Sequence, residues 1–260
     1  MLIAAGYLFG HVCQQTQQGY ELLFAPSAKD ALRLALWLLA ALGAVAFTAG
    51  LVAALLRPLW VGFAAFALSA LAMLIGWELK ATSGALAAVY FLASALYVWG
   101  VARGLEERVN FSVRPISQSQ STLLMALAIV VCASLYLGYA AHIEKEGFSI
   151  PPQFTEAIME RMEREIEKRV PAAEREKALA EFREGFERGL GEFEEKAVKP
   201  YERFIPLALA ASLFMPLVTA IRLLSWIPIL ILRAAFPLLT ALGVTKVVTE
   251  MREVKRLTIG

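Results

Sequence analysis

The chain separates long, almost charge-free apolar runs from one densely charged segment, and this segregation limits the folds open to it. From Glu144 to Arg203 there are 16 Glu and 12 Lys or Arg residues, a net charge of −4. The remaining 200 of the 260 residues hold only 13 Lys or Arg and 7 Asp or Glu. A bilayer interior strongly disfavours charged side chains. The pattern therefore predicts an all-α, polytopic transmembrane bundle that carries a charged segment outside the membrane.

Composition supports this class and excludes others. The hydrophobic content is 58%, whereas soluble domains usually lie near 45–50%. The net charge of +2, without a basic stripe interleaved with aromatic residues, excludes nucleic acid as a partner. Cys13 and Cys132 cannot build a disulfide framework, and His11 and His142 are the two histidines of the chain. Because no CxxC or HExxH motif is present, we expect no metal and no cofactor.

Five apolar segments are long enough to cross the hydrocarbon core, which takes about 20 residues. They are Ala31–Leu56, Leu59–Trp77, Thr82–Ala102, Ser121–Ala141 and Phe204–Ile221. Ser27 and Asp30 resemble a capping box before the first segment, and Pro58 suits the first turn of the second. We expect these first two segments to pack as an antiparallel hairpin.

A sixth apolar segment, Trp226–Val244, is ambiguous. It contains Pro228 and Pro237, and Arg233 lies almost at its centre. A central arginine costs at least about 2.5–3.5 kcal/mol on insertion scales, which the surrounding Leu and Ile residues can offset. The sequence thus leaves both five and six spans open.

The orientation depends on the same segment, because loops rich in Lys and Arg stay in the cytoplasm. With six spans, one side holds seven basic residues, namely Lys29, Arg33, Lys80, Lys246, Arg252, Lys255 and Arg256. The other side holds five, namely Arg57, Arg103, Arg108, Arg114 and Arg222. With five spans the basic tail changes sides, and the count becomes three against nine. The charged segment then faces away from the cytoplasm.

Shorter segments precede the first span and connect the third span to the fourth. Met1–Cys13 is apolar, but too short to span, so we expect an interfacial or partly buried segment. Arg103–Gln120 is a polar connection in which Val109–Arg114 alternates as in a short extended piece, ended by Pro115. The predicted organisation is an interfacial segment (1–26), a four-span bundle (27–142), a charged helical insert (143–203), one or two spans (204–245) and a basic tail (246–260).

Two residue patterns predict how the spans pack and where they end. Small residues four apart let helix backbones approach closely, as in Ala40/Ala44, Ala46/Gly50, Gly84/Ala88, Gly100/Gly104 and Ser134/Gly138. All five tryptophans lie near the end of a predicted span, where their rings favour the membrane interface.

The charged insert contains two amphipathic helices. The first has an apolar stripe at four-residue spacing, made of Phe154, Ile158, Met162, Ile166 and Val170. Pro171 ends it, because the residue before a proline disfavours helical geometry. The second stripe consists of Leu179, Phe182, Phe186, Leu190, Phe193 and Ala197. The pairs Glu160/Arg164 and Glu184/Arg188 have the favourable i,i+4 spacing.

Two roles remain open for this helical hairpin. Its stripes either bury against each other, in the manner of a short coiled coil, or lie on the membrane surface. Alternatively, Phe182, Phe186, Leu190 and Phe193 form a docking face for a second copy of the chain or for another protein. The excess of glutamate argues against attraction to anionic headgroups.

Catalytic chemistry finds no support. The five firm spans hold no Asp, Glu or His at mid-depth, and a serine without an adjacent base is not activated. No nucleotide-binding glycine motif is present. We therefore predict a non-enzymatic structural or interaction component.

A rival hypothesis is a small-solute or anion transporter, or a channel component, that binds its substrate at Arg233. Pro228 and Pro237 bracket that residue and are able to break a helix, as at many transporter sites. Since no cleavable signal precedes the spans, we expect direct insertion into a plasma (inner) membrane, with the lipid bilayer as a partner.

Overall fold

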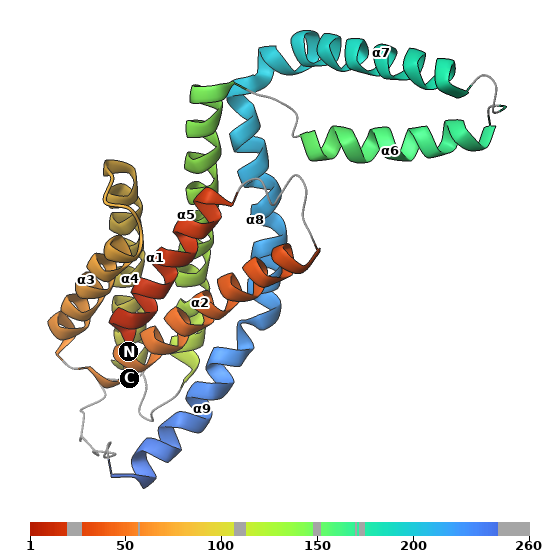
Figure 1. The fold of residues 1–260 in the computed structure, drawn as a ribbon. Helices are drawn as coiled ribbons and strands as arrows, with labels where there is room; N and C mark the ends of the chain where they lie inside the picture. Colours follow the sequence, from red (N-terminus) through yellow and green to blue (C-terminus); the bar gives the residue numbers. More distant parts are fainter. Residues whose placement is uncertain are drawn as a thin grey trace, which may run out of the picture.

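The computed structural model describes residues 1–19, 28–56, 58–106, 113–147, 152–169, 171 and 175–243, and within them no strand occurs. The all-α fold is therefore confirmed (Figure 1). The α-helices are α1 (Leu2–Gln18), α2 (Ala28–Leu55), α3 (Leu59–Gly76), α4 (Ala81–Glu106), α5 (Arg114–Glu146), α6 (Pro152–Arg169), α7 (Arg175–Phe193), α8 (Ile205–Leu224) and α9 (Trp226–Ala241). A π-helical turn, Glu194–Val198, and a 3₁₀ helix, Lys199–Phe204, join α7 to α8.

Five stretches are long and apolar enough to cross a membrane. Four correspond to α2, α3, α4 and α5, and the fifth, Lys177–Ala241, runs from within α7 through α8 and α9. Their outward faces carry large apolar side chains, such as Ile75 and Met215, each 71% exposed. Soluble proteins rarely expose such contiguous apolar surface. The bundle is thus compatible with a lipid environment.

Helix α1 packs into the bundle and lies between α2 and α3 (Figure 1). One face of α1 is buried, including Phe9, Val12 and Cys13. The close hairpin expected of the first two spans is therefore wrong in its packing, because α2 and α3 scarcely touch and α3 packs on α1 and α4. Of the two positions expected for Met1–Cys13, partial burial agrees with the packing of α1. A position at the membrane interface stays a prediction.

Glycines explain why α1 approaches α3 so closely. A Cβ added at Gly10 would collide with the carbonyl oxygen of Met73, and one added at Gly76 would collide with that of Tyr7. A Cβ at Gly6 would meet Ser69. Ser69 also donates a hydrogen bond of 3.1 Å to the carbonyl oxygen of Leu2. Lipid supplies no hydrophobic force between helices, so close packing of their backbones decides which helices are neighbours. The glycines allow this close packing between α1 and α3, and α1 therefore occupies the place beside α3 that was expected for α2.

Helix α5 begins earlier than the sequence pattern predicts. The polar connection was expected to continue to Gln120, yet the helix starts at Arg114 with Pro115 in its first turn. Proline favours this position because the first turn needs no backbone N–H from it and its φ is already helical. Pro115 thus lies in the first turn of a helix. Residues 107–112, most of the predicted alternating stretch, lie outside the described residues, as does Ser27.

Helices α8 and α9 form one bent rod and not a hairpin (Figure 1). Ser225 between them keeps a helical backbone, with φ −60° and ψ −23°. α8 packs on α5 and α9 packs on α2, where the fully buried Leu232 fills the space left by Gly50. α9 also continues through Pro237. The sixth apolar segment thus continues α8 and does not turn back beside it, and the number of membrane crossings stays a prediction.

The predicted small-residue contacts are confirmed in part. Gly100 faces Ser119 and Gly104 faces Pro115, so that pair forms the α4–α5 contact. Gly138 lies against the backbone of Gln17, whereas Gly84 has no neighbour within 4 Å of an added Cβ. Four tryptophans are exposed on the outside of the helices, namely Trp37, Trp60, Trp99 and Trp226, whereas Trp77 is buried.

Candidate functional site

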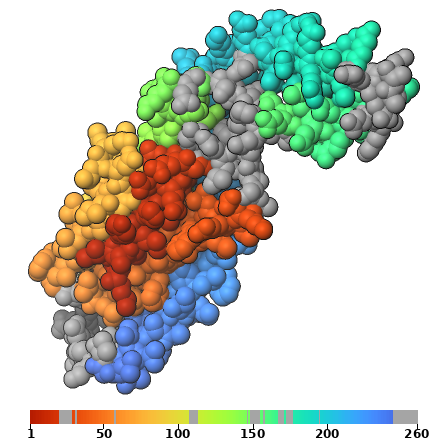
Figure 2. All heavy atoms as spheres, in the orientation of Figure 1, coloured from red at the N-terminus to blue at the C-terminus, as the bar shows by residue number. Residues whose placement is uncertain are grey.

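Helices α6 and α7 form an arm that projects from one end of the bundle (Figure 2). α6 ends at Arg169, just before Pro171, as predicted. α7 begins at Arg175 and runs back beside α6 (Figure 1). The arm therefore has the helical-hairpin topology expected of the charged insert. A coiled-coil packing of the two helices stays a prediction.

One ion pair joins the two helices of the arm. Arg183 Nε donates a hydrogen bond of 2.7 Å to Glu163 Oε1. The hydrogen bond and positive charge of Arg183 hold the pKa of the Glu163 carboxyl below its usual value, and the carboxylate raises the pKa of Arg183 in return. The predicted pairs Glu160/Arg164 and Glu184/Arg188 are confirmed. These pairs stiffen single helices, whereas the Glu163–Arg183 contact ties α6 to α7.

The phenylalanine stripe of α7 is only partly covered. Phe182, Phe186 and Leu190 are half-buried, and the ring centroids of the two phenylalanines lie 5.8 Å apart. Phe193 is 56% exposed, and Met162 on α6 is 45% exposed. Among the described residues of the arm, no side chain is fully buried. The described side chains of the arm thus form no buried core, and the docking role of its stripe stays a prediction.

Arg233 lies on the exposed side of α9, next to the buried Leu232. No ion pair joins its guanidinium to a residue that the structure describes. The structure therefore places Arg233 on the outer surface of the α8–α9 rod, away from the core of the bundle. Its role in transport stays a prediction.

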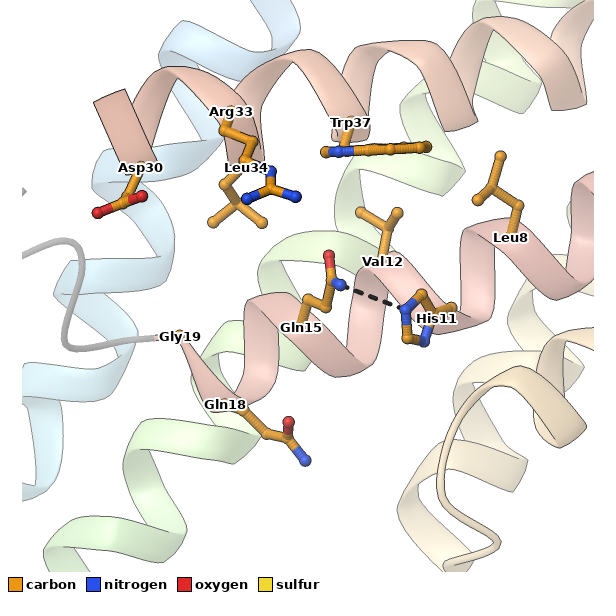
Figure 3. Close-up of a pocket in the computed structure, with 10 residues that line it drawn as sticks. All are labelled: Leu8, His11, Val12, Gln15, Gln18, Gly19, Asp30, Arg33, Leu34 and Trp37. Carbon is orange, nitrogen blue, oxygen red and sulfur yellow. Dashed lines mark hydrogen bonds between the residues drawn. The ribbon is translucent and has the colours of Figure 1, made fainter. Parts of the chain in front are cut away.

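Sequence reasoning missed a pocket of about 600 Å³ between α1 and α2 (Figure 3). The polar residues that line it are His11, Gln15, Gln18, Asp30 and Arg33. The side chains of His11 and Gln15 are 3.2 Å apart and hydrogen-bonded. Arg33 and the amides supply hydrogen-bond donors, while apolar residues including Leu8 and Trp37 complete the wall. The pocket can hold a polar group but presents no activated nucleophile.

A second polar hollow of about 340 Å³ lies near the same end of α1, with Gln14, Gln17, Gln18, Glu78, Lys80, His142 and Lys145 among its lining residues. Trp77 Nε1 donates a 2.6 Å hydrogen bond to Gln17 Oε1, which ties α3 to α1. The hydrogen bond from Lys80 and its charge lower the pKa of Glu78. The sequence signal for both hollows is the group of glutamines from Gln14 to Gln18. In the sequence alone, these glutamines indicate only where an apolar segment ends.

Neither hollow resembles a metal centre. In the described ranges, no group of three or more His, Cys, Asp and Glu side chains is close enough to hold a metal ion. No protein-family model, no curated protein and no solved structure matches the chain.

Proposed function

We propose that the protein is a membrane-embedded interaction component, and that its α6–α7 arm docks a second copy of the chain or another protein. The observation that carries this proposal is the incomplete burial of the arm. Its apolar side chains lie on an otherwise highly charged pair of helices, and none of those described is fully buried. Exposed apolar residues rimmed by charges are typical of protein interaction sites.

The energetics of a two-helix pair support this role. Fully burying a Phe or Met side chain contributes about 1.5–3 kcal/mol. Two helices cover at most one side of each stripe, so Met162 and Phe193 remain accessible. Two such arms packed together give the four-helix bundle arrangement, in which every stripe faces a common core. A partner protein that offers one or two amphipathic helices would provide the same cover.

The path of the last helices favours an arm on the non-cytoplasmic side. α9 continues the direction of α8 (Figure 1), as expected if the chain has five spans. In that case the side that holds the arm has three basic loop residues and the opposite side has nine. The basic-rich side stays in the cytoplasm. We infer that the arm meets its partner outside the cytoplasm.

Site-specific photocrosslinking tests the docking role in the full-length membrane protein. A benzophenone amino acid at Phe193 is expected to crosslink to a second copy or to another protein, and mass spectrometry of the adduct identifies which. The matched control is the same probe at Ala180, an exposed residue on the opposite side of α7. An equal yield of adducts at both positions, or none at Phe193, would contradict the proposal.

Charge insertion provides the second test. Met162→Glu with Phe193→Glu places carboxylates on the exposed apolar positions and should abolish the adduct captured by a benzophenone probe at Leu190. The control Ala180→Glu with Gly191→Glu adds the same charge on the other side of α7 and should leave that adduct intact. Helix content by circular dichroism must stay equal in both variants. An adduct that persists in the first variant argues against a docking face.

A further inference from the structure

A groove of about 540 Å³ separates α5 from α8 at the end of the bundle opposite the arm. One end of the groove is polar and is lined by Ser121, Thr122, Arg222 and Ser225. The rest is apolar and is lined by Leu124, Met125, Ala126, Ile129, Val218 and Ile221. The groove is therefore polar at one end and apolar along the rest. Its polar residues lie where the apolar stretch of α5 begins and where that of α8 ends.

Among the described residues that line it, the polar end carries one positive charge and no acid. Arg222 is exposed and makes no ion pair with a described residue. No carboxylate is among the residues that line the groove. Ser121 and Ser225 donate to the backbone carbonyls of Gln118 and Arg222, so their hydroxyl protons are already used within the helices. The polar end thus offers the Arg222 guanidinium to an anion.

The apolar part runs along the helix axis and is long enough to seat the upper part of an acyl chain. Thr122 and Ile129 are seven residues apart on α5, which corresponds to about 10 Å along a helix axis. On α8, Val218 lies about one turn inward from Arg222. Ala126 is the small residue in the middle of the α5 wall, and it keeps the groove open.

We propose that this groove binds an anionic phospholipid, with its phosphate at Arg222 and one acyl chain along Ala126 and Ile129. A guanidinium matches the geometry of a phosphate and forms paired hydrogen bonds with it. Basic pockets between membrane helices hold anionic headgroups in this manner. A soluble anion would use only the polar end and would leave the apolar wall unexplained. The inference is independent of the docking role of the arm.

Lipid titration followed by native mass spectrometry tests the site in the full-length protein. The probes are dioleoyl phosphatidylglycerol and dioleoyl phosphatidylcholine, which have the same chains and differ in headgroup charge. The wild-type protein is expected to bind the first phosphatidylglycerol about tenfold more tightly than phosphatidylcholine, because the choline cation offsets the phosphate charge and one charge-assisted contact contributes on this order. Equal affinities for the two lipids would overturn the proposal.

Substitutions separate the headgroup from the acyl chain. Arg222→Gln should remove the preference for phosphatidylglycerol, because it weakens phosphatidylglycerol binding more than phosphatidylcholine binding. Arg222→Lys should retain part of the preference. Arg233→Gln, the same change at an exposed arginine on α9, should keep the full preference. Ala126→Phe, which fills the apolar wall, should weaken the binding of both lipids.

Two outcomes would refute the assignment. A preference that survives Arg222→Gln would place the anionic lipid elsewhere on the protein. Inorganic phosphate that displaces phosphatidylglycerol, when chloride at the same ionic strength does not, would identify a site for a soluble anion. Circular dichroism of each variant shows that helix content is retained, so that neither result reflects misfolding.

Discussion

Arg183 Nε lies 2.7 Å from Glu163 Oε1, and this hydrogen bond joins α7 to α6. Because Arg183 lowers the pKa of Glu163 below the ordinary value of 4.5, the paired arm binds fewer protons than the open arm. The contact therefore stabilises the pair fully above pH 4.5. Its contribution is lost as the pH falls through the lowered pKa of the paired arm. We expect α6 and α7 to separate more readily in acid.

Distances between spin labels measure this separation. Labels at Arg161→Cys and Glu187→Cys sit on exposed positions of the two helices, and the buried Cys13 and Cys132 are shielded from the reagent. The distance distribution should broaden below pH 4.5 in the wild-type background. Arg183→Gln should broaden it already at pH 7 and remove most of the pH dependence. A distribution that is unchanged by Arg183→Gln would show that the apolar stripes alone hold the pair.

The α1–α3 contact should be intolerant of a single methyl group. Gly10→Ala places a Cβ against the backbone of Met73, and overpacking of this kind costs about 1–3 kcal/mol. Gly43 on α2 is the control, because an added Cβ meets nothing within 4 Å. We expect thermal unfolding in detergent to show a lower Tm for Gly10→Ala and an equal or higher Tm for Gly43→Ala. Equal Tm values for the two variants would mean that α1 does not pack on α3 as described.

Gln120 should cost the bundle stability. Its side chain is 1% exposed, and neither its Nε2 nor its Oε1 has a hydrogen-bond partner among the described residues. An unsatisfied buried amide costs about 1–3 kcal/mol, so Gln120→Leu should raise the Tm. Gln118→Leu, at an exposed position of the same helix, should change stability by no more than about 0.5 kcal/mol. A lower Tm for Gln120→Leu would show that the amide makes a favourable interaction in the membrane.

The bent α8–α9 rod predicts opposite accessibility for the arm and for the end of α9. Glu184→Cys lies in the arm and Leu242→Cys lies just beyond α9, and both positions are exposed. A membrane-impermeant thiol reagent applied to intact cells should label position 184 and not position 242. Permeabilised cells should be labelled at both positions. Labelling of both positions in intact cells would show that the sixth apolar segment crosses the membrane. Labelling of position 242 alone would place the arm in the cytoplasm.

Several features follow from the sequence because they depend on local pattern and on the solvent. Charge-free apolar runs define the membrane-compatible helices α2, α3, α4, α5 and α8 to within a few residues at most ends. Pro171 separates α6 from α7, and i,i+4 spacing predicts the ion pairs within the insert. Helical periodicity places Phe182 and Phe186 on one side of α7, where the structure finds them in contact.

Proline positions show where such local reasoning fails. Pro115 reads in the sequence as the end of an extended piece, yet the same residue suits the first turn of a helix. Pro237 reads as a helix breaker, yet α9 continues through it. Both outcomes depend on what packs against the surrounding backbone. That information is absent from any short window of residues.

The sequence by itself determined that the chain is helical, that it separates apolar from charged segments, and that its insert is amphipathic. Only the tertiary structure decided that α1 lies between α2 and α3, that α9 continues from α8, and that α5 and α8 leave a groove beside Arg222. The physical reason is that apolar runs report which residues avoid water, whereas lipid favours no helix neighbour over another. Neighbours are chosen by the shape of the contact, as where Gly10 meets the backbone of Met73.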